Sequence, residues 1–152
     1  MKLVKSQLVL DEFFVINSNY KFIEPENEDI NLKELMKDYE IDIDFNVRDV
    51  NDEDNRYIIF IKVSINQNEN HLAGYSIFAE GVSFFSFENH KDLTEKEMSD
   101  LLWVSGVSMC INNIRNFVCS QSTYYPLGKY TLPSVDLTNL LNTKKELLNK
   151  KK

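Results

Sequence analysis

The sequence predicts an α+β protein in which a four-stranded antiparallel sheet is followed by a long helix, a crossover loop and a C-terminal helix. Three observations predict it: four strand-like runs come first, a capped helical segment follows them, and a Leu-Pro turn leads into a last apolar helix. The 152 residues (1–152) fit a single domain, since a chain near that size buries roughly 70% of the surface that its unfolded form exposes.

The first strand is predicted over residues 13–22, where Phe14, Ile16 and Tyr20 alternate with polar residues. A proline and a run of acidic residues end it. Residues 30–39 fit either a short helix or a loop, because their apolar residues have helical spacing but the segment is short.

The second and third strands differ in how many of their faces are apolar. Residues 41–48 alternate strictly between apolar and polar, which predicts one dry face and one wet face. A turn is predicted over residues 51–55, whose Asn and Asp side chains can bond to their own backbone. In residues 56–66, Ile58 and Phe60 add apolar groups to the second face, which predicts a central strand covered on both sides.

The fourth strand is predicted over residues 72–87, after a polar loop at residues 67–70. Gly81 lies inside it, and a glycine inside a strand pattern indicates a bulge or a bend. Together the four runs predict an antiparallel sheet built largely of hairpins.

A capping box opens the long helix, because the Thr94 hydroxyl can accept a backbone amide while Glu97 reaches back. An apolar stripe then predicts a helix that continues to about Ser122 and is roughly 40 Å long. The stripe consists of Trp103, Val107, Cys110, Ile114 and Phe117.

Small residues interrupt this helix at Ser105, Gly106 and Ser108. Such residues permit close packing, either on the protein's own sheet or on a helix of another subunit, and the sequence leaves both open. An aromatic crossover begins at residues 124–128. The last helix is predicted from near Val135 to about residue 150, with a basic end over residues 143–152.

The composition argues against several classes of function. The formal net charge is −7, and an acidic protein gives a nucleic-acid role little electrostatic support. The sequence has no run that could span a bilayer and no signal-peptide core, so we expect a cytoplasmic protein without an integral membrane segment. Cys110 and Cys119 are nine positions apart on one helix and are interpreted as small buried apolar residues.

No enzyme motif is present, and we expect no catalytic residue, no metal and no cofactor. An enzyme would have to combine His71 or His90 with a cysteine, yet both histidines lie in predicted surface loops. Asp42 and Asp44 share the polar face of a strand, where solvating charges are the simpler interpretation.

The chain has many large apolar side chains for one small sheet and two helices. Leaving several of these side chains exposed in a groove would lower the stability of the protein. A function in binding extended, unfolded polypeptide would explain such a groove. Packing in the core remains the alternative explanation for each individual side chain. The aromatic candidates are Phe13, Phe45, Tyr75, Phe78, Phe84, Phe85, Phe87, Tyr124, Tyr125 and Tyr130.

The turn into the last helix carries a family resemblance. Leu132, Pro133, Val135, Leu137 and Leu140 match the closing signature of the SecB family of protein-export chaperones, while the residues at 134, 136 and 141 depart from it. The order of strands, long helix, crossover and closing helix is similar to that family over almost the whole chain. The sequence therefore resembles a divergent SecB-like protein.

The resemblance implies a homo-oligomer, a dimer of dimers, that binds unfolded polypeptide in apolar grooves formed by the second strand, the crossover and the last helix. It places the client-binding residues at Ile41, Ile43, Phe45, Tyr125, Leu132, Leu137, Leu140 and Leu141. It places the subunit contact on the long helix, at Trp103, Ser105, Gly106 and Ser108.

Two departures concern the partners. The Pro-Tyr-Ala-Arg sequence of the family's long helix is replaced by residues 110–113, and the acidic residue that meets the export ATPase corresponds to Ser76. The resemblance thus implies an ATP-independent holdase, with the export ATPase as one partner. Since some members of the wider group serve toxin-antitoxin systems, the alternative is a dedicated chaperone or adaptor with one client.

Overall fold

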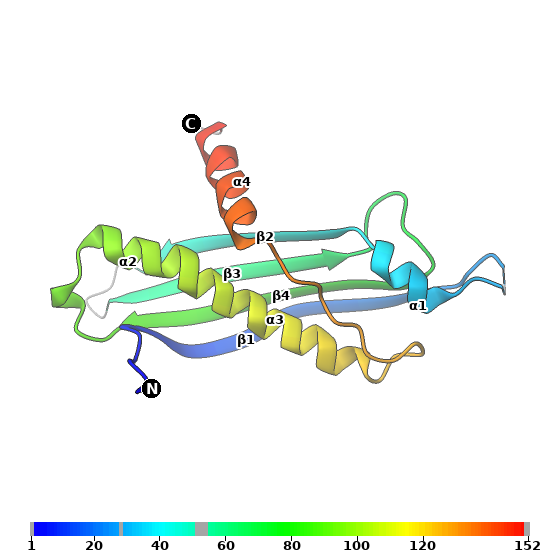
Figure 1. Cartoon of the computed structure of the whole chain (residues 1–152), viewed down its shortest axis with the longest axis horizontal. Coiled ribbons are helices and arrows are strands. Elements are labelled where there is room, and N and C mark those ends of the chain that lie inside the picture. Colours follow the sequence, from blue (N-terminus) through cyan, green and yellow to red (C-terminus); the bar gives the residue numbers. More distant parts are fainter. Residues whose placement is uncertain (1, 28, 51–54, 151–152) are drawn as a thin grey trace.

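A computed structural model describes residues 2–27, 29–50 and 55–150. Within these residues the protein has the predicted α+β architecture, a four-stranded antiparallel sheet with helices packed against it (Figure 1). Most of the turn predicted at residues 51–55 lies outside the described residues.

The strands are β1 (Leu8–Ile23), β2 (Ile41–Asp49), β3 (Arg56–Ile65) and β4 (Gly74–Phe87), and their order in the sheet is β1-β4-β3-β2. Two hairpins join the last three strands, as predicted, and β1 returns to pair with β4. β1 is longer than the sequence predicts, because Leu8 to Leu10 continue the ladder opposite Phe85 to Phe87.

The irregularity predicted at Gly81 lies on the neighbouring strand. Gly81 pairs with Val15 and the preceding residue of β4, Glu80, pairs with Asn17, so Ile16 is the extra residue and β1 carries a bulge here. Gly81 instead accommodates a ring, because a Cβ at this position would lie 2.6 Å from Cε2 of Phe13.

Helices α2 (Glu95–Leu101) and α3 (Val107–Ser122) flank a π-helical turn, η3 (Leu102–Gly106), and together form the long helix of Figure 1. The predicted capping box at Thr94 is confirmed. The π turn coincides with Gly106, which is buried, and a Cβ there would lie 2.8 Å from Cδ1 of Ile59. Packing on the protein's own sheet therefore accounts for this glycine.

Three shorter helical segments and one last helix complete the described chain. Helix α1 (Leu32–Leu35) begins at an Asn31 cap and continues into the 3₁₀ turn η1 (Met36–Asp38). A second 3₁₀ turn, η2 (His90–Asp92), precedes α2, and α4 (Leu137–Lys150) follows the crossover. The segment that fitted either a helix or a loop is thus partly helical.

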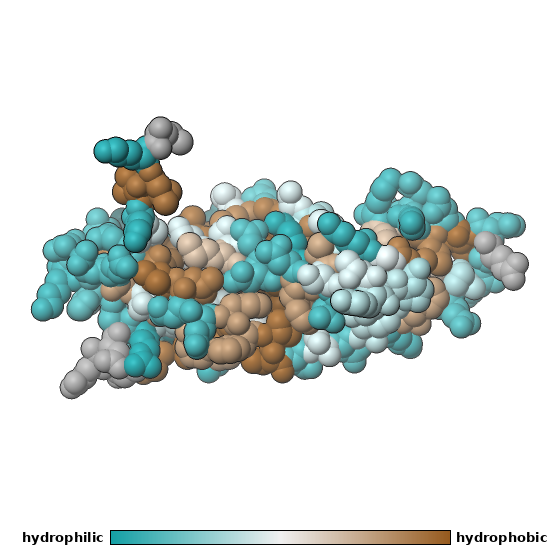
Figure 2. All heavy atoms as spheres, turned by 90° about the horizontal axis from the view of Figure 1, so that it is seen from below, coloured by the Kyte–Doolittle hydropathy of each residue, from teal (hydrophilic) through white to brown (hydrophobic). Residues whose placement is uncertain are grey.

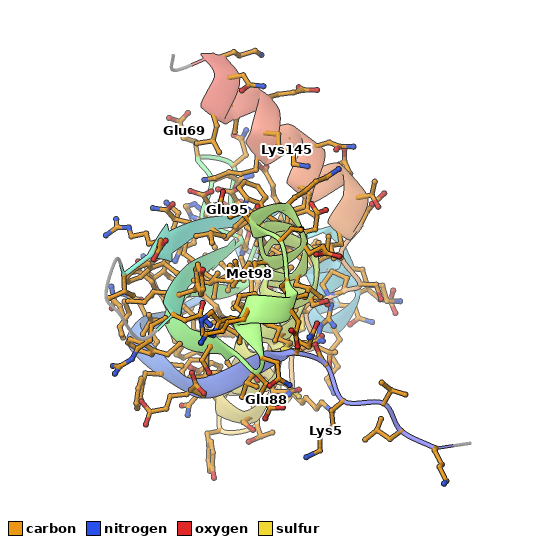
Figure 3. All side chains as sticks on the ribbon, turned by 90° about the vertical axis from the view of Figure 1, so that its left-hand side faces the viewer. Lys5, Glu69, Glu88, Glu95, Met98 and Lys145 are labelled. Atoms are coloured by element: carbon orange, nitrogen blue, oxygen red, sulfur yellow. The ribbon has the colours of Figure 1, made fainter. Side chains whose placement is uncertain are left out.

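All helices lie on one side of the sheet, as the end-on view shows (Figure 3). Under them, the odd-numbered residues of β3 from Ile59 to Ile65 are almost completely buried, together with Phe85, Val107 and Ile114. No helix of the described residues covers the opposite face, where Ile58 and Phe60 are half-buried. The prediction that β3 is covered on both sides is therefore wrong for this single chain.

Candidate functional site

A cleft of about 600 Å³ lies between strand β2 and helix α4. Strand β2, the crossover loop and one face of α4 line it, together with Lys62 of β3. The lining residues are Ile41, Asp42, Ile43, Asp44, Phe45, Lys62, Leu132, Pro133, Ser134, Val135, Asp136, Asn139, Leu140, Thr143, Lys144, Leu147 and Leu148.

The strand side of the cleft is a sheet edge. Within the described residues β2 pairs with β3 alone, so its second edge has no strand neighbour. The Phe45 amide donates to the Asp44 carboxylate at 2.9 Å, a bond to a side chain instead of to a strand. Such an edge offers backbone groups with which an extended peptide can pair.

The helix side of the cleft is partly uncovered. Leu141 anchors the start of α4 in the core, whereas Leu147 is 50% exposed and Leu148 is 44% exposed. In Figure 1, α4 projects past β2 away from the body of the protein. The apolar groups on the last turns of this helix therefore remain available to a bound molecule.

An ion pair joins the two sides. The Lys144 ammonium lies 2.5 Å from Oδ1 of Asp44 and over the Phe45 ring, 5.6 Å from its centroid. Burial raises the pKa of Asp44, but the hydrogen bond and charge of Lys144, the Phe45 amide and the charge of Lys62 outweigh it. The pKa of this carboxyl is therefore lowered.

Arg115 of α3 fixes the crossover loop. Its guanidinium donates to the Leu132 carbonyl at 3.2 Å and to the Pro133 carbonyl at 2.9 Å, while a third bond to Asn112 orients it. Because these carbonyls belong to the Leu-Pro turn, Arg115 determines where Leu132, which is 2% exposed, enters the floor of the cleft.

Tyr75 holds the first part of the crossover. Its hydroxyl donates to the Gly128 carbonyl at 2.8 Å and accepts from the Leu127 amide at 2.7 Å. Burial raises the pKa of Tyr75 to about 12, the Leu127 bond opposing it, so the hydroxyl keeps its proton and its donor role at neutral pH.

The structure brings together some of the predicted client-binding residues and separates others. Leu137 faces a smaller hollow beside Ser108, Leu141 is in the core, and Tyr125 stacks on Tyr20 with ring centroids 3.5 Å apart. The predicted residues that line the cleft are Ile41, Ile43, Phe45, Leu132 and Leu140. Lys144, Leu147 and Leu148 were missed, although all three continue the face that Leu140 begins.

Most of the aromatic side chains considered for a groove do not form one. Tyr75, Phe85, Phe87 and Tyr130 are buried in the core. Tyr124, by contrast, is 88% exposed at the start of the crossover.

The histidines and cysteines considered for catalysis do not line the cleft, whereas Asp42 and Asp44 do. Both histidines are exposed, and the Cys110 thiol is buried, where it donates to the Ser83 hydroxyl. Burial raises the pKa of Cys110 to about 11, the Ser83 bond opposing it, which makes this thiol a poor nucleophile. Within the described residues, no group of three or more His, Cys, Asp or Glu side chains could hold a metal ion.

Comparison with known proteins identifies the fold. A SecB-like chaperone from Mycobacterium tuberculosis, solved with a ChAD peptide from the HigA1 antitoxin, matches 86% of this chain and 91% of its own, with 14% identity and a TM-score of 0.58. The chain has the SecB-like fold. A Streptococcus agalactiae protein of unknown function matches 86% of this chain and all of its own, at 9% identity and a TM-score of 0.40.

At the level of sequence, no family model and no curated protein matches this SecB-like chain. In the part of the chain that the structure describes, no helix is long and apolar enough to cross a membrane.

Proposed function

We propose that this SecB-like protein is a cytoplasmic, ATP-independent chaperone that holds extended, non-native polypeptide in the cleft between β2 and α4. One observation carries the proposal: an unpaired strand edge and a helix with exposed leucines face the same apolar hollow. The first can pair with the backbone of a client and the second can cover its side chains.

Backbone pairing and burial of side chains together favour clients that differ in sequence but are extended and apolar. Backbone pairing does not depend on side chains, so it accepts any segment that can extend. A fully buried Leu or Phe side chain contributes about 1.5–3 kcal/mol, so apolar segments are preferred and binding stays reversible. Because native proteins bury such segments, this site selects unfolded chains and needs no nucleotide.

Aggregation of an unrelated, thermally unfolded enzyme tests the proposal. We expect a stoichiometric amount of the protein to suppress light scattering without ATP, and a dye-labelled extended apolar peptide to compete. The control is a polar peptide of equal length that is rich in Asp and Lys. No suppression at a tenfold molar excess would contradict a general holdase.

A dedicated chaperone of a toxin-antitoxin system is the second candidate. The neighbour from Mycobacterium tuberculosis, with its antitoxin peptide, favours it. The two candidates differ in breadth, since a dedicated chaperone protects one client and leaves unrelated unfolded proteins to aggregate. In either case a role in export would need a contact with the export ATPase. By the family resemblance, Ser76 occupies the position of the acidic residue that makes this contact.

A further inference from the structure

The two edges of the sheet differ in regularity. Within the described residues one edge is β1, the side from which Figure 2 views the molecule, and its pairing with β4 has register shifts after Leu10 and after Val15. Such shifts interrupt the row of backbone groups that an added strand needs. The other edge is β2, which pairs with β3 without a shift from Ile41 to Asp49 and is therefore the more regular template.

Every second residue of β2 turns its backbone toward the free edge. The Glu40 carbonyl accepts from the Asn66 amide at 2.8 Å, and the Val50 amide donates to the Arg56 carbonyl at 3.1 Å. Both bonds continue the β2–β3 register, so the even-numbered residues point toward β3. Because successive residues of an antiparallel strand alternate in this direction, the odd-numbered ones point outward. The outward residues are Ile41, Ile43, Phe45 and Val47.

The Asp44 side chain covers one of these outward amides. Its Oδ1 accepts from the Phe45 amide at 2.9 Å and from the Lys144 ammonium at 2.5 Å. An amide has one proton, so while Phe45 donates to the carboxylate it cannot donate to the carbonyl of a bound peptide. A strand that pairs along the whole edge must first displace Asp44.

A displaced carboxylate has a second partner close by. Lys62 is the cross-strand neighbour of Asp44, and its ammonium lies 3.8 Å from Oδ2. The two side chains are 43% and 50% exposed, so Asp44 can rotate toward Lys62 without disturbing the core. Because one oxygen accepts from both Phe45 and Lys144, the same rotation also breaks the contact between β2 and α4.

We propose that Asp44 reversibly blocks the β2 edge, an inference that rests on the proposed chaperone function. Without a client the carboxylate occupies the Phe45 amide and holds Lys144. A client carbonyl displaces it toward Lys62, which pairs the client backbone at Phe45 and frees α4 to move outward. Since the client must replace a charge-assisted bond, the block selects segments that extend over several residues of the edge and supply several bonds at once.

A simpler role for Asp44 is to anchor α4 through Lys144, and three substitutions separate the two roles. Asp44→Ala removes both the block and the anchor. Asp44→Asn keeps an acceptor oxygen for the Phe45 amide but loses the charge, and Lys144→Met removes the anchor alone. If Asp44 were only an anchor, all three variants would bind a peptide alike.

Affinity for an uncharged, dye-labelled, extended apolar peptide, measured by fluorescence anisotropy, tests the block. We expect Asp44→Ala to bind this peptide about tenfold more tightly than the wild type, because no charge-assisted bond has to be broken. Asp44→Asn and Lys144→Met should each change the affinity by less than about threefold. Asp42→Ala is the matched control, since it removes the same charge from the same strand of the cleft and leaves the bond to Phe45 intact.

Hydrogen exchange of the Phe45 amide, followed by nuclear magnetic resonance, is a second measurement that anchoring alone would not change. Without peptide, we expect exchange in Asp44→Ala to be at least about tenfold faster than in the wild type, and not in Lys144→Met. Saturating peptide should slow this exchange in both the wild type and Asp44→Ala. Far-ultraviolet circular dichroism checks that each variant folds.

The outcomes distinguish this inference from the chaperone function on which it rests. Peptide binding that is equal in the wild type and Asp44→Ala, or equally altered in Asp44→Ala and Lys144→Met, would overturn the block and leave the chaperone function standing. An unchanged exchange rate at Phe45 in Asp44→Ala would also overturn it. Absence of peptide binding in the wild type and in every variant would overturn both.

Discussion

Lys144 in α4 contacts Asp44 in β2 at 2.5 Å, and this pair joins segments that are 100 residues apart in the sequence. The neighbouring Lys145 lies over Trp103, 5.9 Å from the ring centroid, while Trp103 itself meets Phe45 edge-on. Two lysines therefore fix the helix that forms one wall of the cleft. These polar contacts add to the burial of Leu141, which anchors the start of the helix in the core.

Removal of the ion pair loosens α4. Because the Asp44 side chain is 43% exposed, solvent weakens the pair, and we expect Asp44→Asn and Lys144→Met each to lower the free energy of unfolding by roughly 0.5–1 kcal/mol. The double variant loses less than the sum, since both changes remove the same contact. Urea unfolding followed by Trp103 fluorescence measures it, and Trp103 is the chain's only tryptophan.

The same pair predicts a dependence on pH. The pKa of Asp44 in the folded protein is lowered from the ordinary 3.8, so the pair stabilises α4 fully above that value. This stability is lost as the pH falls through the folded-state pKa. We expect a Trp103 fluorescence transition below pH 3.8 that Asp44→Asn abolishes. A transition unchanged in that variant would assign it to another carboxyl.

We expect the exposed leucines of α4 to contribute to client affinity. Replacing Leu147 and Leu148 by serine removes apolar surface from the cleft and should weaken binding of an apolar peptide about tenfold, equivalent to roughly 1.4 kcal/mol. Stability should change by less than about 0.5 kcal/mol, because both side chains are half exposed. Val104→Ser is the matched control, since Val104 is also 50% exposed but does not line the cleft. Equal losses in both variants would contradict the cleft.

We expect Arg115 to affect peptide binding by positioning the Leu-Pro turn, because it does not itself line the cleft. Arg115→Ala leaves the Leu132 and Pro133 carbonyls without their charged donor and should cost about 1.5–3 kcal/mol of stability for the charge-assisted bonds. The Leu-Pro turn then moves, so peptide affinity falls as well. Arg115→Lys keeps the charge but cannot donate to both carbonyls in one plane, so it separates the effect of geometry from that of charge. Full peptide affinity in this variant would contradict the role of the paired guanidinium bonds.

The sequence predicts the sheet better than it predicts the cleft. Alternation in β2 and the capping box at Thr94 are local patterns, so both elements lie where they are expected. Arg115 and Lys144 act across distances in the chain that no periodic pattern reports. The family resemblance placed Tyr125 in the client-binding groove. In the structure its ring stacks on Tyr20 instead, a contact that the sequence did not predict.

The bulge in β1 shows a second kind of limit. A glycine in a strand predicts irregularity, but the pairing of two strands decides which one carries it. The π turn η3 ends at the buried Gly106, which lies against Ile59 of β3, a contact that the helical pattern did not predict. Such features depend on contacts between elements, which composition and spacing do not contain.

Gly81 offers a test of that packing. A methyl group at this position would lie 2.6 Å from the Phe13 ring and 3.3 Å from the Phe14 carbonyl, so Gly81→Ala should lower the free energy of unfolding by about 1–3 kcal/mol. If the ring is the obstacle, the same substitution should cost less in a Phe13→Leu background, because the smaller side chain leaves room. Chemical denaturation of the four proteins of this cycle measures the coupling. Additive losses would show that the Phe14 carbonyl, and not the ring, opposes a side chain at Gly81.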